Sequence, residues 1–269
     1  MGDHEMSEVS QQSERMEEFP PALPPAQPGL NWLPGGSILT QIPAITLNAA
    51  RLESRRIISY DVADQRSKSF DVLRTQILQE MDRKQWQVVA VTSPTAGCGK
   101  TLTAINLAIS IARQPERAAL LVDMDLRKPQ VARRLGIGCE AGLVGVLEGQ
   151  SSLPAAMLRA QIGRHEVLVL PAETTPTDSS EWMASRAMRE VLGAIKRDFR
   201  PWTVILDLPP MLMGDDVLAV LPIVDCALLV TAVGTTTVAE VEECNRYLQS
   251  TNVVRVVVNK VPDWNNRYY

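Results

Sequence analysis

Trp86-Gln-Val-Val-Ala-Val-Thr-Ser-Pro-Thr-Ala-Gly-Cys-Gly-Lys-Thr101 is the stretch of sequence that decides the fold. Within it, Val88 to Val91 are uniformly apolar and predict a short buried strand, and the small residues from Ser93 to Gly99 predict a loop. A helix is expected over 102–113, because apolar side chains recur there at helical spacing: Leu102, Ile105, Ile109 and Ala112. The stretch therefore predicts a strand, a loop and a helix in immediate succession.

A loop of this composition beside a helix N-terminus suits a polyphosphate, because its inward-turned N–H groups add to the unpaired donors of the helix. Lys100 would reach the β- and γ-phosphates, and the Thr101 hydroxyl would bind Mg²⁺. The full pattern expects glycine or alanine five places before Gly99, where this chain has Pro94, so the assignment needs support from other motifs. The predicted nucleotide-binding residues here are Gly97, Cys98, Gly99, Lys100, Thr101 and Leu102.

The composition is that of a chain with one substantial core. Of its 269 residues, 45% are hydrophobic and 22% are charged, and the formal net charge is −4. A charge this close to neutrality argues against recognition of nucleic acid or of a membrane surface by bulk charge. Asp225 interrupts the best candidate for a membrane span, 217–233. The four cysteines lack paired metal spacing, so we expect reduced thiols in the cytoplasm.

The chain divides into four predicted parts. Residues 1–36 are acidic at first and then proline-rich, which indicates a disordered arm. Residues 37–67 carry short apolar runs and are interpreted as a linker that docks on the core. Residues 68–264 form the predicted P-loop domain, and 265–269 form a short tail that contains tyrosines.

From Trp86 onward, apolar strand candidates alternate with helical stretches. The predicted strands are Val88–Val91, Ala118–Val122, Val167–Leu170, Val204–Leu206, Ala227–Val230 and Val253–Val258, and an amphipathic helix over Phe70–Met81 precedes them. Such alternation predicts an α/β fold, a P-loop NTPase with a mostly parallel central sheet and helices on both faces.

Acidic residues directly follow two of these strands, where ligands bind in parallel sheets. Asp207 has the position of a carboxylate that holds Mg²⁺ through water, although it could instead cap a helix, since two prolines follow it. Asp123 and Asp125, separated by one residue, could share a metal or accept a hydroxyl proton beside a γ-phosphate.

Three ordered motifs resemble those of the bacterial tyrosine kinases (BY-kinases), cytoplasmic P-loop proteins that regulate exopolysaccharide and capsule synthesis. The motifs are Gly97-Cys-Gly-Lys-Thr101, Val122-Asp-Met-Asp-Leu-Arg-Lys-Pro129 and Ile205-Leu-Asp-Leu-Pro-Pro210. The resemblance runs from about Phe70 to Lys260. Loops of that family often lack the leading glycine, which makes Pro94 acceptable.

The resemblance implies a role for each site residue. Asp123 would be the base for a tyrosine hydroxyl, and Asp125 and Asp207 would be partners of the metal, together with Thr101. Lys100, Mg²⁺ and Arg127 would stabilise the transferring phosphoryl group.

Asn259 closes the last predicted strand near the expected base pocket. It could hydrogen-bond adenine, or it could be a turn-forming residue before Pro262. Lys260 and Asp263 lack the spacing of the guanine signature, so ATP is preferred to GTP.

Three features depart from the BY-kinase pattern. Leu208 replaces the threonine of the family's Asp-Thr-Pro-Pro pattern after the third motif strand. The family's Glu-x-x-Arg-x-x-Arg motif, which helps those kinases assemble into rings, is replaced by Lys68, Asp71 and Arg74, so two of its three charges are reversed. The tail ends with only Tyr268 and Tyr269, which are either autophosphorylation sites or ordinary tail residues.

The resemblance implies an ATP-dependent protein-tyrosine autokinase that regulates exopolysaccharide and capsule biosynthesis. Its implied partner is a membrane-bound polysaccharide copolymerase on a separate chain, so the kinase would be cytoplasmic and peripheral at the inner membrane through that partner. A homo-oligomer is also implied, whereas nucleic acid is not expected as a partner.

Two other hypotheses remain open. A positioning ATPase of the ParA/MinD type shares the sheet and the order of motifs, but such ATPases usually carry an extra lysine early in the loop, and none stands between Gln87 and Cys98. A degenerate ATP-binding regulator without kinase activity is the second, because Lys68, Asp71 and Leu208 depart from the family pattern.

Overall fold

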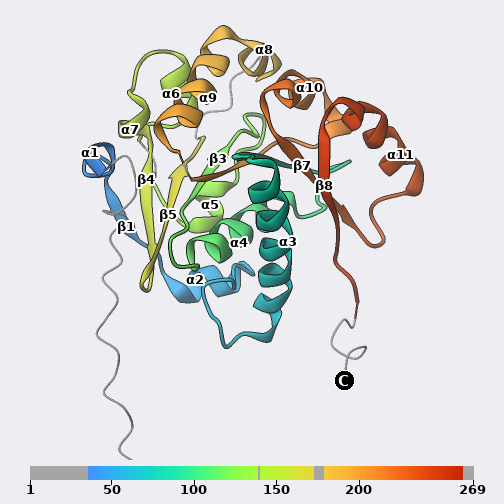
Figure 1. The fold of residues 1–269 in the computed structure, drawn as a ribbon, viewed down its shortest axis with the longest axis horizontal. Coiled ribbons are helices and arrows are strands. Elements are labelled where there is room, and N and C mark those ends of the chain that lie inside the picture. The colour runs from blue at the N-terminus through green and yellow to red at the C-terminus, as the bar shows by residue number, and fades with distance from the viewer. Residues whose placement is uncertain (1–35, 139, 173–178, 201, 263–269) are drawn as a thin grey trace, which may run out of the picture.

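The computed structural model describes residues 36–138, 140–172, 179–200 and 202–262, so most of the predicted arm and the whole tail lie outside it. In the described chain, eight strands form one sheet in the order β1-β4-β5-β3-β6-β2-β7-β8 (Figure 1). Neighbouring strands are parallel except β4 and β5, which are antiparallel. The strands are β1 (Ala44–Thr46), β2 (Val88–Thr92), β3 (Ala119–Asp123), β4 (Leu158–Ile162), β5 (His165–Leu170), β6 (Thr203–Asp207), β7 (Cys226–Ala232) and β8 (Asn252–Asn259).

Helices pack on both faces of this sheet. Residues of α2 to α5 belong to one buried cluster, and residues of α6 and of α8 to α11 belong to the other. The helices are α1 (Gly36–Leu39), α2 (Ala49–Ser54), α3 (Lys68–Lys84), α4 (Lys100–Ala112), α5 (Val131–Leu135), α6 (Leu143–Leu147), α7 (Leu153–Ala156), α8 (Ser179–Ala184), α9 (Arg186–Asp198), α10 (Asp216–Val220) and α11 (Val238–Tyr247).

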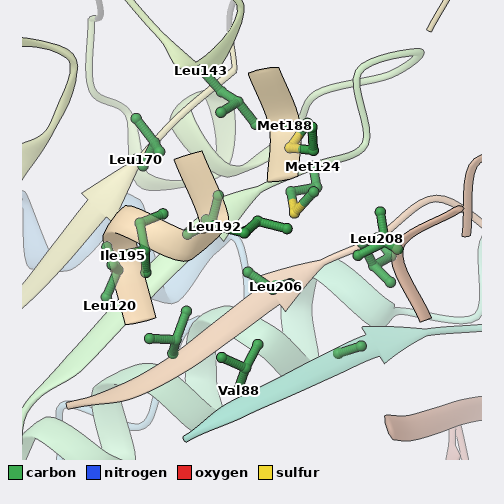
Figure 2. Packing of buried hydrophobic residues seen from close by; sticks show 14 of the residues in the cluster. Val88, Leu120, Met124, Leu143, Leu170, Met188, Leu192, Ile195, Leu206 and Leu208 are labelled. Carbon is green, nitrogen blue, oxygen red and sulfur yellow. The ribbon is translucent and has the colours of Figure 1, made fainter. Parts of the chain in front are cut away.

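The two clusters divide the side chains of each central strand between them. In β3, Leu120 packs in one cluster and Leu121 in the other, because successive side chains of a strand point to opposite faces. Figure 2 shows the cluster that contains Leu120, in which Leu192 and Ile195 of α9 lie over the strand that carries Leu120. Burial on both faces explains why the central strands are continuously apolar in the sequence.

Helix α4 lies almost wholly inside the molecule, and its polar residues are bonded. The Asn106 side-chain oxygen accepts the N–H groups of Ile58 and Ser59, which attaches the segment before α3 to the helix that follows the phosphate-binding loop. This segment, within residues 37–67, also supplies β1 and α2. The division of the chain into domains stays a prediction.

The predicted fold class is confirmed, and each of the six predicted strands is present, with ends within two residues of those expected. The helix expected over 70–81 extends over 68–84, and the one expected at 102 begins at Lys100. Strands β1 and β4 were not predicted, because β1 has only three residues and β4 carries polar Arg159 and Gln161. Among the described residues, no helix is long and apolar enough to cross a membrane.

Candidate nucleotide-binding site

The loop between β2 and α4 has the backbone conformation that its glycines allow. Gly97 and Gly99 have φ angles of +84° and +98°, in the left-handed region that side chains disfavour. A Cβ atom at Gly99 would also lie 2.2 Å from the Asn259 side-chain nitrogen. Only glycine therefore fits at the residue that precedes α4.

Lys100 and three acidic residues meet where β3 and β6 end. Asp123 and Asp207 are the last residues of these strands and are paired in register. The Lys100 Nζ atom, at the first residue of α4, lies 2.8 Å from the Asp125 Oδ2 atom and 3.5 Å from the Asp207 Oδ1 atom. The structure thus brings together Lys100, Asp123, Asp125 and Asp207, as the sequence predicts, and all four are buried.

The charges of this cluster do not balance, because one ammonium faces three carboxyl groups. Burial disfavours the ammonium form of Lys100, but the Asp207 and Asp125 carboxylates outweigh this and raise its pKa. Burial raises the pKa of Asp207 despite the nearby Lys100, and burial together with Asp207 raises the pKa of Asp123 to about 8. The site therefore favours an additional cation.

The donors present fit a magnesium ion. The Asp207 Oδ2 atom is buried and has no hydrogen-bond partner among the described residues, and a carboxylate oxygen is the ligand that Mg²⁺ prefers. The Thr101 hydroxyl lies beside it, 3.4 Å from the Lys100 Nζ atom. Described backbone N–H groups do not reach the Asp207 carboxylate, so Asp207 does not cap a helix in this structure.

The Asp123 carboxylate instead receives backbone N–H groups. Its Oδ2 atom accepts from Gln130 and from Val131, both at 2.9 Å, and its Oδ1 atom accepts from Asp125 at 3.2 Å. These bonds fix the loop that runs from β3 to α5. No motif in the sequence indicated that this candidate base would also hold the loop around it.

Arg127 lies in the same loop but pairs away from Lys100. Its guanidinium lies 2.9 Å from the buried Asp216 carboxylate at the start of α10, and Asp216 also accepts the Ser179 hydroxyl of α8 at 2.9 Å. Sequence reasoning missed Asp216 and Ser179. The Asp215-Asp216 pair shortly after the third motif was the available signal.

Asn259 contacts the phosphate-binding loop directly. Its Nδ2 atom donates to the Cys98 carbonyl oxygen at 2.9 Å, and its Oδ1 atom accepts the Lys260 N–H at 2.8 Å. The Cys98 side chain is buried, and Leu102 lies in the first turn of α4, where its carbonyl accepts from Asn106. Asn259 thus ends β8 against the phosphate-binding loop, and its predicted role toward adenine stays a prediction.

The residues at the ring-motif positions on α3 bond within the chain. The Asp71 carboxylate lies 3.1 Å from Arg113 Nη1 and 3.0 Å from Arg74 Nη1, and it accepts the Ser110 hydroxyl at 2.6 Å. Arg113 and Ser110 belong to α4 and its end, whereas Lys68 is exposed. The predicted acceptors Tyr268 and Tyr269 lie outside the described residues.

Comparison with known proteins bears on this site. The CobQ/CobB/MinD/ParA nucleotide binding domain matches residues 89–268. The tyrosine-protein kinase YwqD of Bacillus subtilis is 31% identical over 70% of this chain and 77% of its own length. EpsB of Ralstonia nicotianae is 30% identical over 75% of this chain but only 26% of its own length. This chain therefore spans about a quarter of the length of EpsB.

Solved structures have the same fold. The kinase domain of the Escherichia coli tyrosine kinase ETK superimposes with a TM-score of 0.66 at 27% sequence identity, over 74% of this chain and 78% of that chain. The similarity thus extends over most of the chain.

Proposed function

Because this chain belongs to the bacterial tyrosine kinases of the CobQ/CobB/MinD/ParA nucleotide-binding class, we propose that it is an ATP-dependent tyrosine autokinase. One observation carries the proposal: Lys100, Asp125 and Asp207 meet beside the phosphate-binding loop, and a carboxylate oxygen of Asp207 is left unpartnered among the described residues. A cationic group and free carboxylate oxygens are what a Mg-polyphosphate needs.

ATP binding exchanges the partners of Lys100. The N–H groups of the loop and the start of α4 bind the phosphates, and Lys100 turns from Asp125 and Asp207 to the β- and γ-phosphates. Thr101, Asp125 and Asp207 would hold Mg²⁺, which supplies positive charge against the phosphates when bound. The carboxylates that face Lys100 in this structure are then satisfied by the metal.

Asp123 accepts the proton of the tyrosine hydroxyl in this proposal. Its Oδ2 atom is occupied by two N–H groups, whereas its Oδ1 atom accepts one long bond and keeps a free lone pair. The proton therefore goes to Oδ1. Because the backbone holds the carboxylate, little reorganisation is needed for transfer.

Arg127 needs a rearrangement to take part, since it pairs with Asp216 in this structure. We assign it the role of stabilising the transferring phosphoryl group after that pair opens. Tyr268 and Tyr269 are the proposed acceptors, and Asn259 is a proposed contact to adenine that already lies against the loop.

The test is incubation of the whole protein with Mg-ATP, followed by mass spectrometry for phosphotyrosine at Tyr268 and Tyr269 and by measurement of released phosphate. Lys100→Met removes the ammonium that faces the phosphates and should abolish both signals, whereas Lys128→Met, at an exposed lysine of the loop between β3 and α5, should retain them. Phosphate release without phosphotyrosine would show that the protein is a positioning ATPase and not a kinase. If the protein binds ATP but forms neither phosphotyrosine nor free phosphate, even with an activating partner, it is a nucleotide-binding regulator without kinase activity.

The proposed biological role is regulation of exopolysaccharide and capsule synthesis. The partner would be a membrane-bound polysaccharide copolymerase on a separate chain, which would bring the kinase to the inner membrane from the cytoplasm. Addition of the cytoplasmic part of such a copolymerase should raise phosphotyrosine formation. An unchanged rate at saturating amounts of that partner would exclude this activation.

A further inference from the structure

Five arginines form a surface on the side of the molecule opposite α9. Arg51 and Arg55 belong to α2 and its end, Arg56 follows them, and Arg133 and Arg134 belong to α5. The two helices pack together: the Arg55 Nη1 atom donates to the Arg133 carbonyl oxygen at 2.5 Å, and the Arg51 guanidinium covers Gly136. We call these five residues the arginine face.

The arginine face has no acidic counterpart in the described part of the chain. None of its five side chains forms an ion pair there, and the Arg134 Nε atom is buried without a hydrogen-bond partner. Glu53, the acidic residue within α2, lies 3.7 Å from Arg66 instead. Several other described arginines do form ion pairs, as Arg117 does with Asp82 at 2.6 Å. A concentration of unpaired positive charge favours an anionic partner.

The chain itself contains a segment of matching charge. Residues 3–18 hold six acidic residues, Asp3, Glu5, Glu8, Glu14, Glu17 and Glu18, and one arginine, Arg15. Their excess of five negative charges equals the number of arginines on the face. The net charge of the whole chain is only −4, so this segment accounts for its acidic character.

The connection between the acidic segment and the described fold is long. Residues 19–35 include six prolines, and a proline-rich stretch of this length extends about 50 Å at roughly 3.1 Å per residue. In Figure 1, α1, where the described chain starts, and α2 are the two blue helices along one side of the molecule. We propose that the arginine face binds the acidic segment, residues 3–18, of the same chain.

The place of this contact connects the segment to the nucleotide site. Helix α5 starts at Val131, whose N–H binds the Asp123 carboxylate, and it carries Arg133 and Arg134. The segment therefore docks one short helix away from the candidate base. The contact itself does not depend on the proposed kinase activity.

Cleavage of the whole protein by a glutamate-specific protease tests the proposal. Cuts after Glu5, Glu8, Glu14, Glu17 and Glu18 are followed over time by mass spectrometry at low salt. The variant Arg51→Gln/Arg56→Gln/Arg133→Gln changes the three exposed arginines of the face, and we expect its segment to be cut at least about threefold faster. In about 0.5 M NaCl the two proteins should be cut at the same rate, because charge interactions are then screened.

A matched control separates this contact from bulk charge. Arg83→Gln/Arg186→Gln/Arg197→Gln removes three exposed arginines from α3 and α9 and should be cut like the wild type. Equal cleavage of wild type and face variant at low salt would overturn the proposal, as would faster cleavage of the control. If cleavage is equal and the wild type sediments with phosphatidylglycerol vesicles while the face variant does not, the arginine face binds an anionic lipid surface instead.

Discussion

Asp123 has two tasks in the proposed reaction, since it accepts a proton and also holds three backbone N–H groups. Asp123→Asn keeps one acceptor oxygen, so at least one buried N–H loses its partner, which costs about 1–3 kcal/mol. Loss of a negative charge beside Asp207 offsets part of this cost. We expect ATP binding within about threefold of the wild type, no tyrosine phosphorylation, and an unfolding free energy lower by about 1 kcal/mol.

Calorimetric titration with ATP, denaturant unfolding and phosphotyrosine detection measure these three effects. Loss of ATP binding in the Asn variant, with the fold intact, would make Asp123 a ligand of the metal and leave the base unidentified.

Gly99 and Asn259 form a contact that a double-mutant cycle can test. Gly99→Ala forces a left-handed backbone on alanine, at a cost of about 1–2 kcal/mol, and places Cβ against the Asn259 amide. Asn259→Ala should remove the clash but not the backbone strain. We therefore expect Gly99→Ala to weaken ATP binding at least about tenfold and the double variant to recover part of the loss. Additive effects of the two changes on the affinity would show that the contact is absent.

The sequence predicted the residues of the site that belong to contiguous motifs and missed those that reach it through the fold. Lys100, Asp125 and Asp207 were expected together because each lies in a motif at the end of a predicted strand or of the phosphate-binding loop. The Asp216 partner of Arg127 lies far away in the sequence, in a stretch without a motif. The Asp215-Asp216 pair marked acidic residues there, but only the fold shows that Asp216 pairs with Arg127.

At the level of elements, the bonds between α3 and α4 centre on Asp71. Its carboxylate binds the largely buried Arg113 and Arg74, so Asp71→Ala leaves two arginines without an anion inside the helix pair. We expect the unfolding free energy to fall by about 3 kcal/mol. Asp82→Ala is the matched control, because the Asp82–Arg117 pair at the end of α3 is exposed and should contribute less than about 1 kcal/mol.

Denaturant unfolding of both variants measures the difference. If the unfolding free energy falls equally in the two variants, the contacts of Asp71 do not stabilise the packing of α3 on α4. The Asp71 carboxylate would then be available for contacts with another copy of the chain.

Five of the six strands that the sequence predicted are buried on both faces, and the sixth, β8, is a partly exposed edge strand. Their continuous apolar runs leave little ambiguity, and even the edge strand β8 carried such a run. Strand β1 has only three residues, and β4 alternates polar with apolar residues. Neither strand therefore contains an apolar run long enough to stand out from a loop in the sequence. Their pairing is decided by contact with the rest of the sheet, which local sequence does not encode.

At the scale of the whole molecule, the acidic segment was visible in the sequence, but the gathering of arginines on one surface was not. A net charge of −4 excluded a strongly basic protein, yet it combines an acidic segment with a local excess of arginines. The arginines come from α2 and α5, which are separated by about eighty residues and meet only in the fold. Bulk charge therefore says little about individual surfaces.

Nucleotide binding should stabilise the entire fold, and the size of this stabilisation should depend on Mg²⁺. A ligand that binds only the folded state at about 100 times its Kd adds about 2.7 kcal/mol, which is seen as a higher melting temperature. Without Mg²⁺ the carboxylates of Asp125 and Asp207 repel the phosphates, so ATP with EDTA should give a much smaller shift than Mg-ATP. Thr101→Val removes the hydroxyl proposed to bind the metal and should bring the Mg-ATP shift down to the EDTA value, whereas Thr103→Val, two residues further along α4, should not. An equal shift with and without Mg²⁺ in the wild type would remove the metal from the proposed site.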